Sequence, residues 1–159
     1  MIKKYRKYFK VVDIDILVYR MTKADAVTAE LPEIGYELQS DVQPGKRTRF
    51  FIIDKGVFVH NSHLYQTRHV LKLLNRKGPV VGDCITSSNY RGKSIYPYVI
   101  NKIATMQLNT GAPEVFIIVE PDNVSSIRGI EKAGFKLYAG IKAKRFLLFY
   151  FNVQITRSK

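Results

Sequence analysis

The sequence predicts a mixed α/β fold in which helices pack on one sheet, and three patterns support this. The second half of the chain alternates strand-like and helix-like segments, whereas the first half is mostly strand-like. Residues 114–120 contain a continuous apolar run, which is typical of a strand buried on both faces. Segments that alternate in this way form an α/β or α+β arrangement.

The first half contains the signals of several short strands. Residues 11–19 alternate in part and are rich in β-branched side chains, and residues 36–40 resemble a second strand. Residues 50–53 and 57–59 flank a short Asp-Lys-Gly turn, which predicts a β-hairpin with a positive φ at Gly56.

One segment of the first half has apolar residues at helical spacing, but its secondary structure is ambiguous. In residues 67–75, Val70, Leu71 and Leu74 recur at helical intervals, and Gly78 with the proline that follows ends the segment. Both a helix and a strand stay open for it.

The second half is expected to contain two helices and four strands. Pro97 suits the first turn of a helix, where its missing N–H is not needed, and Gly111 follows the end of that helix. Asp122 or Asn123 caps a second helix that runs to about Ala133. The expected strands cover residues 79–86, 114–120, 135–143 and 145–155, the last two as an antiparallel pair.

The composition is that of an ordinary globular protein. The 159 residues are 46% hydrophobic and 25% charged, and no linker interrupts them, so we expect a single domain over residues 1–159. No apolar run reaches the roughly 18 residues of a membrane-spanning helix. The single cysteine excludes an internal disulfide and multi-cysteine metal sites, which favours a cytoplasmic protein without a metal.

The net charge of +13 favours an anionic partner. Nucleic acid, a phosphorylated cofactor and an acidic carrier protein all fit, and a charge that serves only solubility fits equally well.

A loop between a strand and a helix narrows this choice. The apolar start of residues 80–97 leads into a polar loop with Arg91, Gly92, Lys93 and Ser94, and a helix follows. Free backbone N–H groups and the positive end of the helix dipole favour an anion there, so the loop predicts a phosphate site.

The loop and a segment downstream resemble the acyl-CoA-binding core of the GNAT N-acetyltransferase superfamily. The resemblance covers residues 80–137, and its stronger half is the Asn-Val-Ser-Ser-Ile-Arg-Gly-Ile-Glu-Lys-Ala-Gly-Phe segment at residues 123–135. It implies a GNAT-like fold, with a mostly antiparallel sheet, two splayed parallel strands over residues 80–86 and 115–120, and flanking helices.

The resemblance also implies where acetyl-CoA, or another acyl-CoA, would bind. The pantetheine arm would pair with backbone near Ile85 and Thr86, and Asn123 and Ser126 would face the arm near the thioester. The pyrophosphate would rest on the N–H groups of the loop and the first turn of the helix, which are contributed by Arg91, Gly92, Lys93, Ser94, Ile95 and Tyr96.

Three positions depart from the family pattern. Ser94 and Tyr96 stand where the loop usually has small residues, and Ser94 suits its place with a negative φ. Ile130 occupies the position of the tyrosine that many members use as the general acid.

Several side chains are candidates for the chemistry. Asp83 lies on the first splayed strand, where it could accept a proton from the acceptor amine or be structural. No base is visible beside Cys84, which favours a small buried residue. A surface or hairpin position suits His60 and His63 better than the role of a base. Glu120 could orient the acceptor amine or belong to the cap of the helix that follows. Nothing selects between the phenols of Tyr138 and Tyr150.

The sequence therefore predicts an acyltransferase that moves an acyl group from acyl-CoA to an amine by direct attack in a ternary complex. Two alternatives stay open: an acidic acyl carrier protein as the donor, and a non-catalytic module on the same fold that binds RNA or an acidic protein. Monomer and homodimer are both compatible with the sequence.

Overall fold

The structure, a computed structural model that describes residues 10–158, contains one mixed sheet with strands in the order β2-β3-β4-β5-β6-β1-β7-β8. Its strands are β1 (Val12–Thr22), β2 (Gln39–Gln43), β3 (Arg47–Asp54), β4 (Val57–Tyr65), β5 (Val80–Thr86), β6 (Glu114–Val119), β7 (Lys136–Phe146) and β8 (Phe149–Arg157). The helical segments are α2 (Lys23–Thr28), η1 (His69–Leu74), η2 (Ser88–Tyr90), α3 (Ile95–Asn109) and α4 (Val124–Lys132), of which η1 and η2 are 3-10 helices.

Strands β5 and β6 form the parallel pair of this sheet, and the other pairs are antiparallel. Their pairing is short, because only Val80 and Val81 of β5 face Phe116 and Ile117 of β6. Beyond Val81 the two strands separate, which confirms the expected splayed pair.

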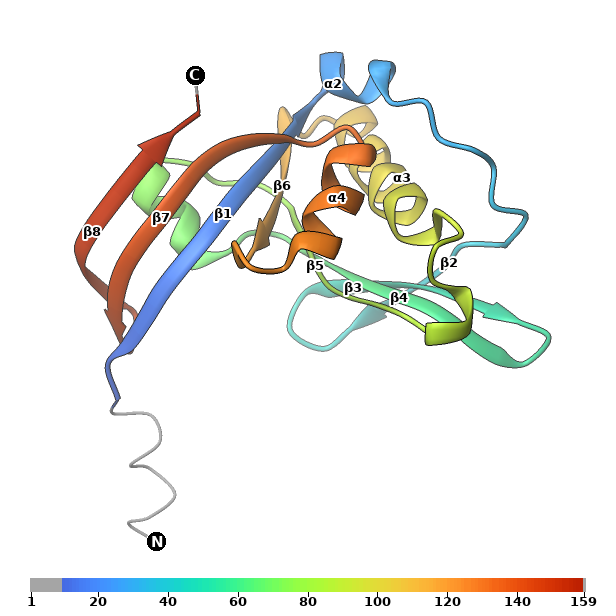
Figure 1. Cartoon of the computed structure of the whole chain (residues 1–159), viewed down its shortest axis with the longest axis horizontal. Helices are drawn as coiled ribbons and strands as arrows, with labels where there is room; N and C mark the ends of the chain where they lie inside the picture. The colour runs from blue at the N-terminus through green and yellow to red at the C-terminus, as the bar shows by residue number, and fades with distance from the viewer. Residues whose placement is uncertain (1–9, 159) are drawn as a thin grey trace, which may run out of the picture.

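Strand β1 lies inside the sheet, between β6 and β7, although it comes first in the chain (Figure 1). Both of its faces are apolar at its C-terminal half. Val18 enters the core on one side of the sheet, and Tyr19 and Met21 enter the core on the other. A strand with two apolar faces is stable only where both faces are covered, so β1 takes a central position.

The helices divide unequally between the two faces of the sheet. Helices α3 and α4 lie side by side on one face, and Ile95, Ile100 and Ile103 anchor α3 in the larger core (Figure 1). On the other face, Leu71 and Leu74 of η1 pack into the smaller core behind β7 and β1. Within residues 10–158, no helix is long and apolar enough to cross a membrane.

Several expected boundaries were wrong. Helix α2 was not predicted; it begins with a capping box, in which Asp25 accepts hydrogen bonds from the backbone N–H and hydroxyl of Thr22. The ambiguous segment forms η1 and ends at Asn75, which has a positive φ. The strand expected at residues 36–40 begins at Gln39, and the turn of the last hairpin falls at Leu147, not near Lys144, because Leu147 takes the positive φ that the turn needs.

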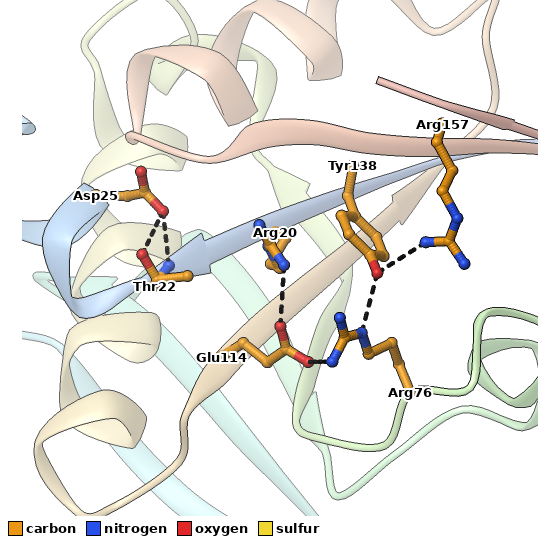
Figure 2. Close-up of polar contacts among 7 residues, drawn as sticks. All are labelled: Arg20, Thr22, Asp25, Arg76, Glu114, Tyr138 and Arg157. Atoms are coloured by element: carbon orange, nitrogen blue, oxygen red, sulfur yellow. Dashed lines mark hydrogen bonds and ion pairs between the residues drawn. The ribbon is translucent and has the colours of Figure 1, made fainter. Parts of the chain in front are cut away.

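A cluster of charged and aromatic side chains joins five parts of the fold (Figure 2). Glu114 of β6 forms ion pairs with Arg20 of β1 and with Arg76 from the loop after η1. The hydroxyl of Tyr138 on β7 accepts hydrogen bonds from Arg76 and from Arg157 of β8. The cluster explains Tyr138 as a structural phenol, since its hydroxyl is occupied by two guanidinium groups that lower its pKa against the effect of burial.

Candidate functional site

The candidate site begins where β5 leaves β6. One residue of β4, Ser62, opposes two residues of β5, Asp83 and Cys84, since Asn61 pairs with Ile85 and His63 pairs with Gly82. The extra residue makes a β-bulge, and Asp83 takes a positive φ of 49° within it. As a result, side chains before and after the bulge line different cavities.

A groove of about 540 Å³ runs from the end of β5 across the first turn of α3 to α4. Eight of the ten predicted cofactor residues line it: Ile85, Thr86, Arg91, Gly92, Ser94, Ile95, Tyr96 and Ser126. Its charged lining residues are Arg91 and Lys132, without a carboxylate. The groove therefore suits a negatively charged ligand that has an extended arm.

The loop before α3 is held in place by contacts from its own side chains. The Nε of Arg91 donates a hydrogen bond to the carbonyl oxygen of Thr86 (3.1 Å), which closes the loop onto the end of β5. Gly92 has a φ of 76°, a conformation that favours glycine. Serine at position 94 suits the loop only at a negative φ, and the structure differs: Ser94 is the N-cap of α3 and is left-handed, with a φ of 60°.

Tyr96 lies against α4, and the glycine opposite it makes this possible. A β-carbon at Gly129 would stand 2.5 Å from Cδ1 of the Tyr96 ring. Only a residue without a side chain therefore fits at position 129 while the ring is there. The bulky residue in the loop is accommodated by a small one on the facing helix.

Helix α4 contributes a face that the sequence analysis identified only in part. Ser125, Ser126, Gly129 and Lys132 line the groove at helical spacing. The Nζ of Lys132 donates a hydrogen bond to the hydroxyl of Ser94 (2.7 Å), which places an ammonium group beside the first turn of α3. Its spacing of seven residues from Ser125, two turns along the same face of α4, was the signal that could have identified it.

Lys93 and Asn123 are the two predicted cofactor residues outside this lining. Lys93 is exposed, with its ammonium group 5.2 Å from the centre of the Tyr90 ring. The side chain of Asn123 caps α4 by accepting a hydrogen bond from the backbone N–H of Ser126 (3.3 Å).

A chain of hydrogen bonds lies behind the groove wall. His60 is fully buried between the hydroxyls of Thr86 (2.8 Å) and Ser62 (2.7 Å), and Ser62 donates to the sulfur of Cys84 (3.1 Å). One arrangement of protons satisfies all four groups: Thr86 donates to Nδ1, and Nε2–H donates to Ser62. His60 therefore lies in the β3–β4 hairpin, as expected, but it is buried and not at the surface.

Burial determines the protonation states in this wall. It lowers the pKa of His60 to about 4, so the imidazole is neutral at pH 7. It raises the pKa of Cys84 to about 12, and the pKa of Tyr96 is raised by burial as well. The wall thus presents a thiol and a phenol, not a thiolate or a phenolate.

Asp83 lines a second cavity on the opposite face of the sheet, together with Val80, Val81 and Gly82. Its carboxylate accepts a hydrogen bond from the hydroxyl of Tyr65 and lies 3.9 Å from a guanidinium nitrogen of Arg68. Tyr150 lines this cavity too, with its ring stacked on His69.

Two further residues have structural positions. Ile130, at the position of the family tyrosine, is completely buried in the larger core. Glu120 is exposed at the end of β6, and its backbone carbonyl accepts a hydrogen bond from the N–H of Asn123.

Ten solved chains resemble this one, and two of them are acetyltransferases of the GNAT family. One is an acetyltransferase of the GNAT family from Colwellia psychrerythraea, with a TM-score of 0.59 and 14% identity over 80% of this chain and 54% of that protein. The other, described as an acetyltransferase of the GNAT family from Novosphingobium aromaticivorans, has a TM-score of 0.56 and 15% identity over 94% of this chain and 68% of that protein.

These likenesses show that the chain has the GNAT acetyltransferase fold. The chain spans about half the length of the Colwellia protein. No protein-family model matches the sequence, and no curated protein matches it either.

Proposed function

We propose that the protein is an N-acyltransferase that binds acyl-CoA in the groove between β5, α3 and α4 and transfers the acyl group to an amine. One observation carries the proposal: the groove opens where β5 parts from β6 and continues to the first turn of α3. Acetyl-CoA is the donor that the fold favours, and it acts as a cosubstrate.

The groove matches the chemistry of such a donor. The N–H groups in the first turn of α3 lack intrahelical acceptors, and Arg91 and Lys132 add two positive charges, so together they suit a pyrophosphate. Beyond Val81, β5 no longer pairs with β6. The backbone N–H and C=O groups on that edge of β5 can therefore pair with the amides of a pantetheine arm.

The reaction then needs little from side chains. The nitrogen of the amine attacks the thioester carbonyl, the C–S bond breaks, and the products are an amide and the thiol of CoA. A backbone N–H of β5 would stabilise the oxyanion. The amine would approach from the opposite face, where Asp83 can accept a proton from its ammonium form. As the amide forms, the nitrogen loses one proton to water, and the departing thiolate gains one from water or through the phenol of Tyr96, which lines the groove and recovers its proton from water.

Calorimetry with CoA and acetyl-CoA tests the donor site. Replacing both Arg91 and Lys93 by alanine should weaken binding by about 1–3 kcal/mol, because charge-assisted contacts with phosphate are lost. Since Arg91 lines the groove and Lys93 does not, Arg91→Ala should account for most of this loss. Lys132→Ala should also weaken binding.

Lys102→Ala is the matched control. It removes one positive charge and a lysine–tyrosine contact from α3 outside the groove, because Lys102 lies 5.2 Å from the centre of the Tyr98 ring. Its affinity for CoA should equal that of the wild type. The proposal would be contradicted if the wild type bound neither CoA nor acetyl-CoA. It would also be contradicted if the Arg91/Lys93 double variant bound CoA as tightly as this control. An acyl carrier protein that displaces CoA in a thermal-shift assay would instead identify a carrier-bound donor.

A further inference from the structure

The second cavity, which contains Asp83, has the dimensions of a site for a small molecule. It measures about 350 Å³ and lies on the η1 face of the sheet. Strand β5 lines the donor groove with residues after the bulge and this cavity with residues before it. The two cavities therefore meet the same strand from opposite faces, next to the point where β5 and β6 separate.

This cavity is lined by more positively charged side chains than negatively charged ones. Asp83 is its one carboxylate, and Arg68 and Arg145 are its cations, with the His69 imidazole beside them. Arg68 is already engaged, since its guanidinium group covers the Tyr65 ring at 3.9 Å and faces Asp83. Arg145 forms no ion pair or side-chain hydrogen bond with any described residue.

The carboxylates on the strand next to Arg145 form ion pairs with other residues. The nearby carboxylates of β1, Asp13 and Asp15, pair with Lys144 and Lys142. The side chain of Arg145 is half-buried, so a positive charge is held at the cavity wall, partly desolvated and without a partner among residues 10–158. Such a group favours a bound anion.

The remaining wall is apolar. Ile14 and Ile16 of β1, Val80 of β5 and Ile118 of β6 form it, and the Tyr150 ring closes one side. A ligand that fills this cavity therefore needs three features: a group that can face Asp83, an anionic group for Arg145, and an apolar part between or beside them.

We infer that the acceptor is a small amine that also carries a carboxylate and an apolar side chain, as an α-amino acid does. Its ammonium faces Asp83, and its carboxylate pairs with Arg145. This inference rests on the proposed function, because only an acyltransferase would bring an amine to the edge of β5 opposite the donor.

Acetylation of paired amines tests the inference. Leucine, methionine and phenylalanine are each compared with the corresponding amide, and the acetylated product is quantified by mass spectrometry. We expect kcat/KM for the free acid to exceed that for the amide by about tenfold or more, as for a lost charge-assisted pair. The amide has the more acidic ammonium and so the more reactive amine at neutral pH, which means that the expected preference opposes intrinsic reactivity.

The Arg145→Gln variant should bring this ratio close to one, mainly by raising KM for the free acid, and Arg145→Lys should retain part of it. Lys144→Gln is the control, because it removes the same charge from the next residue of β7, where Lys144 pairs with Asp13. That control should keep the wild-type ratio.

The inference is overturned if the wild type prefers the amides, if Arg145→Gln keeps the wild-type ratio, or if a wild type that binds acetyl-CoA acetylates neither set. In each of these cases the donor site stands. Failure to bind acetyl-CoA by calorimetry would instead remove the proposed function itself.

Discussion

The most informative single residue is His60, a titratable side chain that is fully buried behind the donor groove. It links β4 to β5 through the hydroxyl of Thr86, whose carbonyl also accepts the hydrogen bond from Arg91. The backbone that would face the ligand is thus held from two sides. His60 therefore stabilises the end of β5 without contacting the groove itself.

We expect the free energy of unfolding to fall as the pH decreases from about 6.5 to about 4, because of His60. Its pKa is lower in the folded protein, so the unfolded state binds the proton first, and stability is fully present above pH 6.5. The loss should reach about 3 kcal/mol near pH 4. Urea unfolding of the wild type and of His60→Gln at pH 7.5 and pH 5 measures it.

The His60→Gln variant should be less stable at pH 7.5 but should lose less stability on acidification. Carboxylates whose pKa is lowered in the folded state, such as Asp25, titrate in both proteins. The free energy of unfolding therefore changes with pH differently in the wild type and in the variant only because of His60. Equal slopes between pH 7.5 and pH 5 would contradict a buried neutral imidazole.

At the scale of elements, the contact between α3 and α4 determines the width of the donor groove. Tyr96 in the first turn of α3 occupies the space left by Gly129 on α4, and Lys132 of α4 bonds to Ser94 at the start of α3. These contacts hold α3 against α4 in a chain that lacks the small loop residues expected at positions 94 and 96. The loop and α4 must therefore be considered together.

Gly129→Ala should destabilise the protein by about 1–3 kcal/mol, the usual cost of overpacking, even though alanine favours helix by up to ~1 kcal/mol. The new methyl group would overlap the Tyr96 ring. Chemical denaturation of Gly129→Ala, Tyr96→Ala and the double variant measures the coupling. The double variant should lose less stability than the sum of the two single changes, and simple additivity would argue against this contact.

At the scale of the whole molecule, the cluster around Glu114 joins both ends of the chain to the middle of the sheet (Figure 2). Arg20 comes from the first strand, Arg157 from the last, and Arg76 from the loop after η1. The side chain of Glu114 is only 11% exposed, and two arginines, Arg20 and Arg76, form ion pairs with it. In a chain of net charge +13, this buried carboxylate thus lies between two arginine side chains and partly neutralises their charge.

Glu114→Gln should lower the free energy of unfolding by about 1–3 kcal/mol, because two guanidinium groups lose their shared anion. Asp13→Asn is the matched control: it breaks the pair with Lys144, but its side chain is 83% exposed, so it should cost less than about 1 kcal/mol. Thermal or urea unfolding compares the two variants. A larger loss in the control than in Glu114→Gln would exclude the cluster as a link between these strands.

Most elements were predictable because their signals are local. Strand β6 has a continuous apolar run, the turn at Gly56 needs a positive φ, and both α3 and α4 end before a glycine. The loop between β5 and α3 was recognisable for the same reason, since its residues are adjacent in the chain. Local propensity was insufficient for α2, whose six residues rely on a capping box and on packing against α3.

The sequence by itself determined the mixed fold, the parallel pair and most of the residues that line the groove between β5, α3 and α4, because each depends on periodicity or on residues close in the chain. Only the tertiary structure decided which residues share a cavity. A one-residue bulge places Asp83 in the second cavity together with Gly82, β1 enters the centre of the sheet, and Arg145 lines the same cavity as Asp83 from more than sixty positions away. These arrangements depend on strand order and register, which no local pattern encodes.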